Sequence, residues 1–313
     1  MQKRFFAFGR WASGALFCLV FAAPAWMTWG VQWLAHDSVK LYFEKKELIV
    51  QMQLVRVATG RTFIPVLFVA AAFFCFLDKP KPADLVWRLY LRISGALALV
   101  LLAAAIPFDW QEEACLGANA FFGGYTFPYL RQGRLDGLQL TLLLGPALAL
   151  PYCLLCAPPR PSRSLWISAP WAGAFVAAFA LPAWKYRAWV RQLAEDPETG
   201  SLAREECLRQ IWLIVQYGAP VLFALLILSL LWRKTSADSL ACWLYFALAA
   251  AFLLASAASW LPFGEGLSPS RISFFDIVSA YGRQGFGGFA VMLILGPAAC
   301  WVSRQMEKRR EGR

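Results

Sequence analysis

The chain has 313 residues, of which 59% are hydrophobic and only 16% are charged. A soluble domain carries about 25% charged residues, so ordinary soluble, disordered and collagen-like proteins are excluded. The formal net charge is +11. Basic residues beside membrane spans set topology and meet anionic head groups, and no basic segment interleaved with aromatic residues points to a nucleic-acid partner. The composition therefore predicts a membrane protein that crosses the bilayer several times.

Continuous apolar stretches predict the membrane spans, because about 17–25 residues of helix cross about 30 Å of hydrocarbon. The stretches do not alternate, which favours helices over barrel strands. The third span is expected to begin early, near Leu85, with Arg88 and Arg92 snorkelling to the interface. The eight expected spans are Trp11–Leu34, Thr62–Leu77, Ile93–Phe108, Leu138–Ala157, Leu165–Trp184, Ile211–Trp232, Leu240–Phe263 and Phe286–Val302.

The loop charges predict the orientation, because Lys and Arg concentrate on the cytoplasmic side of a membrane protein. Both termini are therefore expected in the cytoplasm, with the chain multi-pass in the inner (cytoplasmic) membrane. The segment Ala23-Pro24-Ala25 resembles a signal-peptidase site, but similar residues recur in mid-chain, which favours a retained helix. The basic segments assigned to the inside are 1–10, 78–92, 158–164, 233–239 and 303–313.

The sequence contains an internal repeat, which is its most informative feature. Several short motifs recur in the same order and at nearly constant spacing, as loop insertions and deletions after a tandem duplication would leave them. The matched motifs are Phe21–Trp26 with Phe179–Trp184, Pro65–Phe68 with Pro220–Phe223, Leu89-Tyr90 with Leu244-Tyr245, Arg131–Gly133 with Arg283–Gly285, and Leu144–Pro146 with Leu295–Pro297.

The duplication predicts an all-α polytopic membrane protein whose eight transmembrane helices form two tandem four-helix repeats. Four spans per copy is an even number, so both copies enter the membrane from the same side, as in parallel-repeat transporters. The expected organisation is a first repeat over 1–157, a cytoplasmic linker over 158–164, a second repeat over 165–302 and a basic cytoplasmic tail over 303–313. This plan resembles that of the paraquat-inducible A family, although the cysteine-pair zinc ribbons of that family are missing here.

Two matched Arg-Gln pairs are the candidate ligand-binding residues. Arg131-Gln132 and Arg283-Gln284 each stand just before the last span of a repeat, with glycines close by. A cation at the outer head-group level suits a phosphate or carboxylate ligand. The alternative interpretation is an interfacial anchor followed by a turn.

Matched prolines are the candidate cavity-shaping residues. Pro24 and Pro182 lie near the outer ends of the first spans of the two repeats, and Pro146 and Pro297 lie inside the fourth spans. A proline removes a helical hydrogen bond and kinks the helix. The four kinks would frame a central cavity, or would only shape packing.

The cysteines suggest a disulfide more than a redox centre. Cys115 and Cys207 fall in outside segments, where an oxidising compartment would favour their pairing. Cys153-x-x-Cys156 has redox spacing but lacks an activating neighbour. His36 is the single histidine, so neither a metal site nor a cofactor is expected.

Two amphipathic outside segments, 38–60 and 190–215, are expected to be interfacial helices or outward extensions of the second and sixth spans. The alternative is a docking surface for an envelope partner.

The span interiors contain no Asp, Glu, Lys, Arg or His under these boundaries, which argues against an ion-coupled carrier. We therefore expect a non-enzymatic protein that handles or transports a lipid or other amphiphile at the outer (periplasmic) face. Its expected partners are membrane lipids and a periplasmic or membrane protein. The alternatives are a scaffold or assembly subunit of a cell-envelope complex and, on the cysteines alone, a thiol or quinone oxidoreductase.

Overall fold

The computed structural model describes residues 8–23, 58–77, 79–105, 137–156, 165–196, 204–233, 235–260 and 282–311, together with the single positions 26, 51, 55 and 198. Every regular element in these residues is a helix, which confirms the expected all-helical fold. The helices are Phe8–Ala23, η1 (Thr59–Phe63), α4 (Ile64–Phe76), α5 (Pro82–Ala105), α7 (Gly137–Cys156), α8 (Leu165–Glu195), α10 (Arg204–Leu213), η3 (Ile214–Gly218), α11 (Ala219–Trp232), α12 (Ala237–Trp260) and α14 (Gly282–Glu311).

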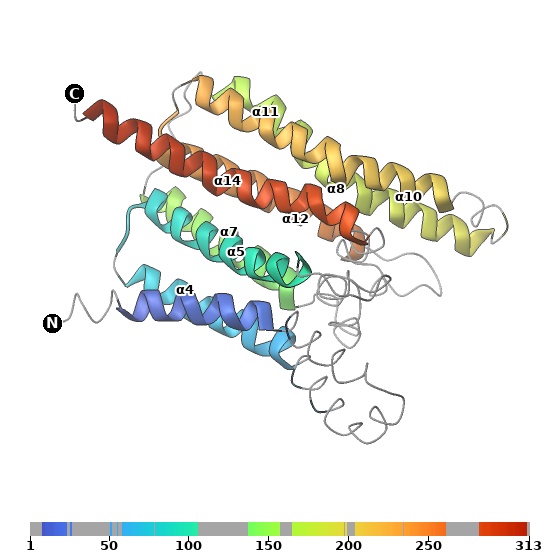
Figure 1. The fold of residues 1–313 in the computed structure, drawn as a ribbon, viewed down its shortest axis with the longest axis horizontal. Coiled ribbons are helices and arrows are strands. Elements are labelled where there is room, and N and C mark those ends of the chain that lie inside the picture. The colour runs from blue at the N-terminus through green and yellow to red at the C-terminus, as the bar shows by residue number, and fades with distance from the viewer. Residues whose placement is uncertain are drawn as a thin grey trace.

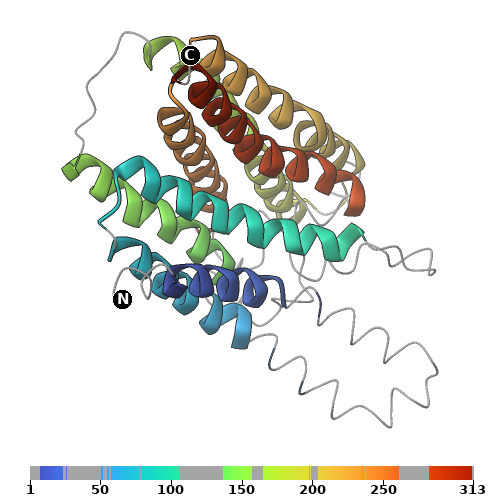
Figure 2. The same cartoon turned by 60° about the vertical axis from the view of Figure 1, so that its left-hand side comes forward.

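The helices form an elongated bundle of two halves (Figures 1 and 2). The helix Phe8–Ala23, α4, α5 and α7 make one half, and the helices from α8 to α14 make the other. The two halves meet along a seam in which α5 packs against α12 and α14, and α7 packs against α12. The start of the helix Phe8–Ala23 and the end of α14 lie at the same end of the bundle (Figure 1).

Each half is built around three phenylalanines. In the first half the buried ring of Phe17 packs between two other buried phenylalanines, and in the second half Phe175 occupies the corresponding position. The buried phenylalanines are Phe17, Phe21 and Phe68 in the first half and Phe175, Phe179 and Phe223 in the second. Tilted aromatic pairs at such distances contribute beyond the area that they bury. The ring centroids are separated by 5.6 Å for Phe17–Phe21, 5.1 Å for Phe17–Phe68, 5.9 Å for Phe175–Phe179 and 4.9 Å for Phe175–Phe223.

Two short π-helical segments stand at matching places in the two halves. The segment η1 runs directly into α4, and η3 runs directly into α11. Proline occupies the first turn of each following helix, at Pro65 and Pro220. Since proline has no N–H to donate to the preceding turn, the helix widens there into the π geometry.

Several helices are longer than the expected spans. The helix α8 continues past Trp184 to Glu195, and α14 runs past both ends of the expected span Phe286–Val302, to Glu311. The helix α10 leads through η3 into α11 without a break, so residues 204–215 of the second amphipathic segment continue into the helix of the expected sixth span, whereas residues 190–195 belong to α8. Most of its counterpart, 38–60, lies outside the described residues.

Two of the described helices, Glu206–Trp232 and Ala237–Ala258, are long and apolar enough to cross a membrane. This assignment rests on length and composition, which a buried core helix can also satisfy. The helices Phe8–Ala23, Ile64–Phe76 and Thr141–Cys156 are apolar but shorter. The structure thus supports a helical protein with two candidate membrane spans.

Candidate functional site: a basic groove beside α5

A groove with a volume of about 340 Å³ lies between the helix Phe8–Ala23 and α5. This volume is within the range of small-molecule sites. Three arginines line it together with apolar residues, Arg10 from the helix Phe8–Ala23 and Arg88 and Arg92 from α5. We call it the basic groove, and its lining residues are Arg10, Trp11, Gly14, Ala15, Cys18, Arg88, Leu91 and Arg92.

The side chain of Arg92 is buried at the inner wall of the groove. Only 8% of the residue is exposed. Its Nη2 donates a hydrogen bond to the backbone carbonyl of Arg10 at 3.1 Å, and its Nη1 contacts the Sγ of Cys75. Its Nε is buried without a hydrogen-bond partner. The expectation that Arg92 snorkels to the interface is therefore wrong.

The local sequence explains why a guanidinium fits between two helices here. Gly14 faces Arg92, and a Cβ at that position would stand 2.9 Å from the Nε of Arg92. The missing side chain at Gly14 leaves the space that the guanidinium fills. On the other side, the Sγ of Cys18 donates to the carbonyl of Arg92 at 3.4 Å, which ties the two helices together at this level.

The groups that accept hydrogen bonds from Arg92, the Cys75 thiol and the Arg10 carbonyl, are neutral. They do not compensate the positive charge of Arg92. Among the described residues no carboxylate pairs with Arg92. A buried cation without a counter-charge is unfavourable, and a bound anion would relieve that cost. The nearest motif match, Leu89-Tyr90 with Leu244-Tyr245, places the buried Ala247 at the equivalent position of the second half. The groove is therefore a property of the first half.

Two acidic residues at this end of the bundle form ion pairs with another arginine. The Nη2 of Arg304, in α14, lies 3.2 Å from Asp238 and 3.8 Å from Asp84. Its guanidinium also lies over the ring of Trp87, 4.7 Å from the centroid. Arg304 thereby joins the first turns of α5 and α12, and both carboxylates lie in ion pairs with it.

At the opposite end of the bundle, cations of α8 contact the ends of other helices. The Nη1 of Arg187 donates to the carbonyl of Ala258 near the end of α12 at 2.6 Å, where a cation complements the helix dipole. Desolvation, and then the charge of Arg191, lower the pKa of Arg187. The Nζ of Lys185 donates to the side chain of Gln210 in α10, so the extension of α8 is fastened to α10.

The structure places only some of the residues singled out from the sequence. Arg131, Gln132, Pro24 and Cys115 lie outside the described residues. Arg283 and Gln284 begin α14, and their side chains are outside the described part of the chain. The proposed ligand pairs therefore stay a prediction. The prolines that lie inside described helices are Pro146 in α7, Pro182 in α8 and Pro297 in α14.

The described cysteines form neither a disulfide with one another nor part of a metal-binding group. Cys207 is free and half-buried, with its Sγ 3.9 Å from the carbonyl of Lys185, and its pairing with Cys115 stays a prediction. Cys153 and Cys156 are also free. Within the described ranges, no group of three or more His, Cys, Asp or Glu side chains could hold a metal ion.

Sequence analysis missed Arg92 as a site residue because it stands one position before the expected third span. The alignment of the two repeats contained a signal for this residue, since Arg92 aligns with an alanine, Ala247, in the other copy. No protein-family model, curated protein or solved structure matches this chain. The basic groove is therefore the feature of the described structure that bears most directly on function.

Proposed function

We propose that the chain is a polytopic inner-membrane protein, with eight spans in two tandem four-helix repeats, that binds an anionic lipid or similar amphiphile without catalysing a reaction. The observation that carries the proposal is the buried guanidinium of Arg92, which lines the basic groove and whose acceptors among the described residues are all neutral. An anion in the groove would supply the missing counter-charge.

The outward faces of the helices support a membrane environment. Large apolar side chains stand exposed along α4 and α11, where a soluble protein would carry polar residues. The exposed fractions are 59% for Val66, 59% for Phe73, 55% for Val221 and 60% for Leu228. Because corresponding helices of the two halves show the same pattern, lipid tails are the natural occupant of these surfaces.

Matched contacts in the two halves support the tandem repeat. The pair Phe17–Phe68 corresponds to Phe175–Phe223, and the π-helical segments η1 and η3 precede corresponding helices. Residues that the sequence motifs equate thus make equivalent contacts. A duplication explains this correspondence in one step, whereas two unrelated bundles would have to acquire it contact by contact.

The groove combines the features that an anionic amphiphile requires. Its guanidinium groups suit a phosphate or carboxylate, which Arg binds through several N–H donors. Leu91 and Ala15 offer an apolar wall for the start of an acyl chain, and Trp11 is 72% exposed, as expected for an aromatic residue at the membrane interface. No single feature of the groove requires catalysis.

The groove lies at the end of the bundle that holds Arg304 and the start of the first helix. The distribution of Lys and Arg supports an orientation with this end in the cytoplasm, in which the groove would face the inner leaflet. The outer Arg131 and Arg283 would then offer a second head-group site at the periplasmic face. Two such sites suit a protein that handles a lipid at both leaflets, with a periplasmic or membrane protein as partner.

Native mass spectrometry of the protein in nanodiscs tests this function. The nanodiscs would contain phosphatidylcholine with a minor fraction of phosphatidylglycerol or phosphatidic acid. We expect the wild type to retain one anionic lipid, and Arg92→Gln to weaken its retention at least about tenfold, since one charge-assisted contact contributes more than about 1.4 kcal/mol. Arg209→Ala, which removes an exposed arginine of α10 paired with Glu206, is the matched control and should bind like the wild type.

Equal retention of anionic and zwitterionic lipid by the wild type would contradict the proposal, as would an Arg92→Gln variant with unchanged selectivity. Arg88→Ala serves as a second variant at the groove, because Arg88 lines the groove and is less buried than Arg92. It should weaken retention of the anionic lipid in the same direction.

A scaffold subunit of a cell-envelope complex is the second candidate function. The observation that favours it is the dense aromatic core, with a cavity of only about 20 Å³ between the halves among the described residues. A scaffold would yield a stoichiometric protein partner after gentle extraction and no selective lipid. The same mass spectra therefore separate the two functions.

A further inference from the structure

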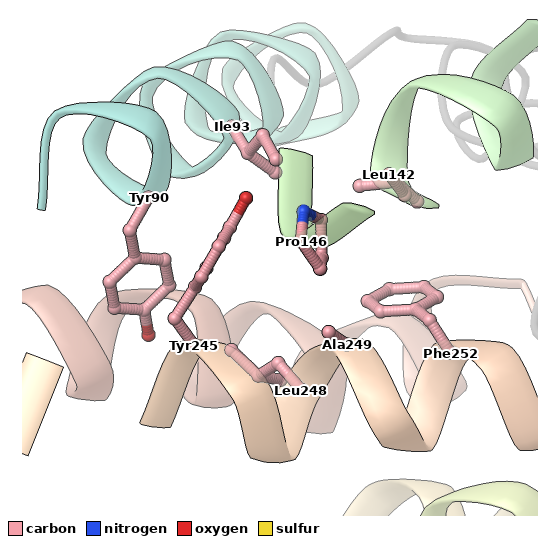
Figure 3. Close-up of a pocket in the computed structure, with 8 residues that line it drawn as sticks. All are labelled: Tyr90, Ile93, Leu142, Pro146, Tyr245, Leu248, Ala249 and Phe252. Carbon is pink, nitrogen blue, oxygen red and sulfur yellow. The ribbon is translucent and has the colours of Figure 1, made fainter. Parts of the chain in front are cut away.

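Two tyrosines face one another across the seam between the halves. Tyr90 belongs to α5 and Tyr245 to α12, and their ring centroids lie 5.7 Å apart at an interplanar angle of 50°. The sequence repeat equates these two residues. Figure 3 shows the ring of Tyr245 standing between Tyr90 and Pro146, with its hydroxyl oxygen beside Pro146 and Ile93.

Each tyrosine reaches a glycine of the opposite half. The hydroxyl of Tyr245 lies against Gly145 in α7, and the hydroxyl of Tyr90 lies against Gly296 in α14. A Cβ at either glycine would overlap the hydroxyl that faces it. Both glycines are followed by proline, so the two contacts are equivalent. A reciprocal pair of tyrosine–glycine contacts therefore joins the two halves at the seam.

Both hydroxyls are polar groups without a partner. Tyr90 and Tyr245 are only 2% and 4% exposed, and neither hydroxyl makes a hydrogen bond in the described part of the structure. A buried hydroxyl without a partner is strongly unfavourable. A hydrogen-bonding ligand at the seam would remove this cost.

The cavity beside Tyr245 supplies the room and a second polar group. Its volume is about 20 Å³, which accommodates one water molecule. Pro146 has no N–H, so the carbonyl of Leu142, four residues earlier, lacks its usual helical donor. Leu142 lines the same cavity. A residue with an unpartnered hydroxyl and a residue whose carbonyl lacks its helical donor therefore border the same small space.

We propose that this cavity is a hydration site, in which one water molecule bonds to the hydroxyl of Tyr245 and donates to the carbonyl of Leu142. The ring of Tyr90 also lines the cavity, whereas its hydroxyl lies against Gly296 and is not part of the site (Figure 3). The water gives the apolar seam a polar link between α12 and α7. The inference goes beyond the proposed function, because it does not depend on any lipid in the basic groove.

The sign of the change in Tm when Tyr245 is replaced by phenylalanine tests the hydration site. If a water occupies the cavity, Tyr245→Phe removes a hydrogen bond and lowers the Tm of the purified protein in detergent. If the cavity is dry, the substitution removes an unpartnered buried hydroxyl and raises the Tm. A rise in Tm would overturn the proposal. Because the ring is kept, the variant is expected to fold.

Ala249→Val provides a second and independent test, because Ala249 lines the cavity and the two extra methyl groups would displace the water. We expect the Tm to fall in the wild-type background, where the polar groups lose their ligand. The fall should be clearly smaller in the Tyr245→Phe background, where less hydrogen bonding is lost. Equal falls in both backgrounds would contradict a bound water.

X-ray hydroxyl-radical footprinting supplies direct evidence, since radicals formed from bound water modify the adjacent side chain. We expect oxidation of Tyr245 at a rate well above that of the equally buried Phe223. Absence of modification at Tyr245 while exposed Trp11 is oxidised would show that the cavity holds no water.

Discussion

The hydroxyl of Tyr90 in α5 rests against Gly296 in α14, where a Cβ would overlap it, and the equated pair Tyr245 and Gly145 makes the same contact in the opposite direction. Gly296→Ala is therefore expected to destabilise the protein by about 1–3 kcal/mol, the usual cost of overpacking a core. Thermal unfolding of the purified variant in detergent measures this loss.

Tyr90→Phe is expected to restore most of the stability of Gly296→Ala, because it deletes the atom that the new methyl group meets. The crossed combination, Tyr245→Phe with Gly296→Ala, is the control and should give no rescue. If both tyrosine variants rescued Gly296→Ala equally, the two contacts would not be separate, and the reciprocal arrangement of the seam would be wrong.

The two aromatic clusters predict matched losses of stability. Phe17→Ala and Phe175→Ala each empty the centre of a fully buried cluster, and each should cost about 3–5 kcal/mol. Equilibrium unfolding in a denaturing detergent compares them. A large loss for one variant and a negligible loss for the other would contradict the structural equivalence of the halves.

The ion pairs of Arg304 predict a smaller and salt-dependent contribution. Arg304→Met removes two partly exposed pairs and a cation–π contact, which together contribute about 1 kcal/mol. The loss should shrink in high salt, where such pairs are screened. Arg191→Ala, which breaks only the exposed pair with Glu195, should change the Tm little at either salt concentration.

The proposed orientation predicts opposite accessibility for the two ends of the bundle. Lys308 and Glu195 are both exposed, one near the end of α14 and the other at the end of α8. In a background without native cysteines, Lys308→Cys should react with a membrane-impermeant maleimide from the cytoplasmic side, and Glu195→Cys from the periplasmic side. Labelling of both cysteines from one side would contradict a membrane-crossing α8.

The sequence patterns correctly predicted the helical class, because long apolar stretches are a local property of the sequence. The positions of Tyr90, Gly145 and Gly296 were visible as repeated motifs. Their contact across the seam was not, since tertiary contacts between distant segments leave no local signal. The kinks expected at Pro24, Pro146, Pro182 and Pro297 stay a prediction. The π-helical segments before Pro65 and Pro220 were not expected from the sequence.

The burial of Arg92 could not be predicted from its own helix. Hydropathy places an arginine at the edge of a span, with its charge in the head groups. What decides its position is Gly14, in a different helix, which leaves room for the guanidinium. The expected ligand site at Arg131 and the disulfide of Cys115 lie outside the described residues, so they stay predictions.

The most direct test of the account is a cryo-electron microscopy structure of the protein in nanodiscs that contain phosphatidylglycerol. The account predicts phosphate density in the basic groove within hydrogen-bond distance of the Nε of Arg92, with an acyl chain beside Leu91, and loss of this density in Arg92→Gln. A carboxylate of the chain itself bonded to that Nε, with the groove closed to lipid, would contradict it.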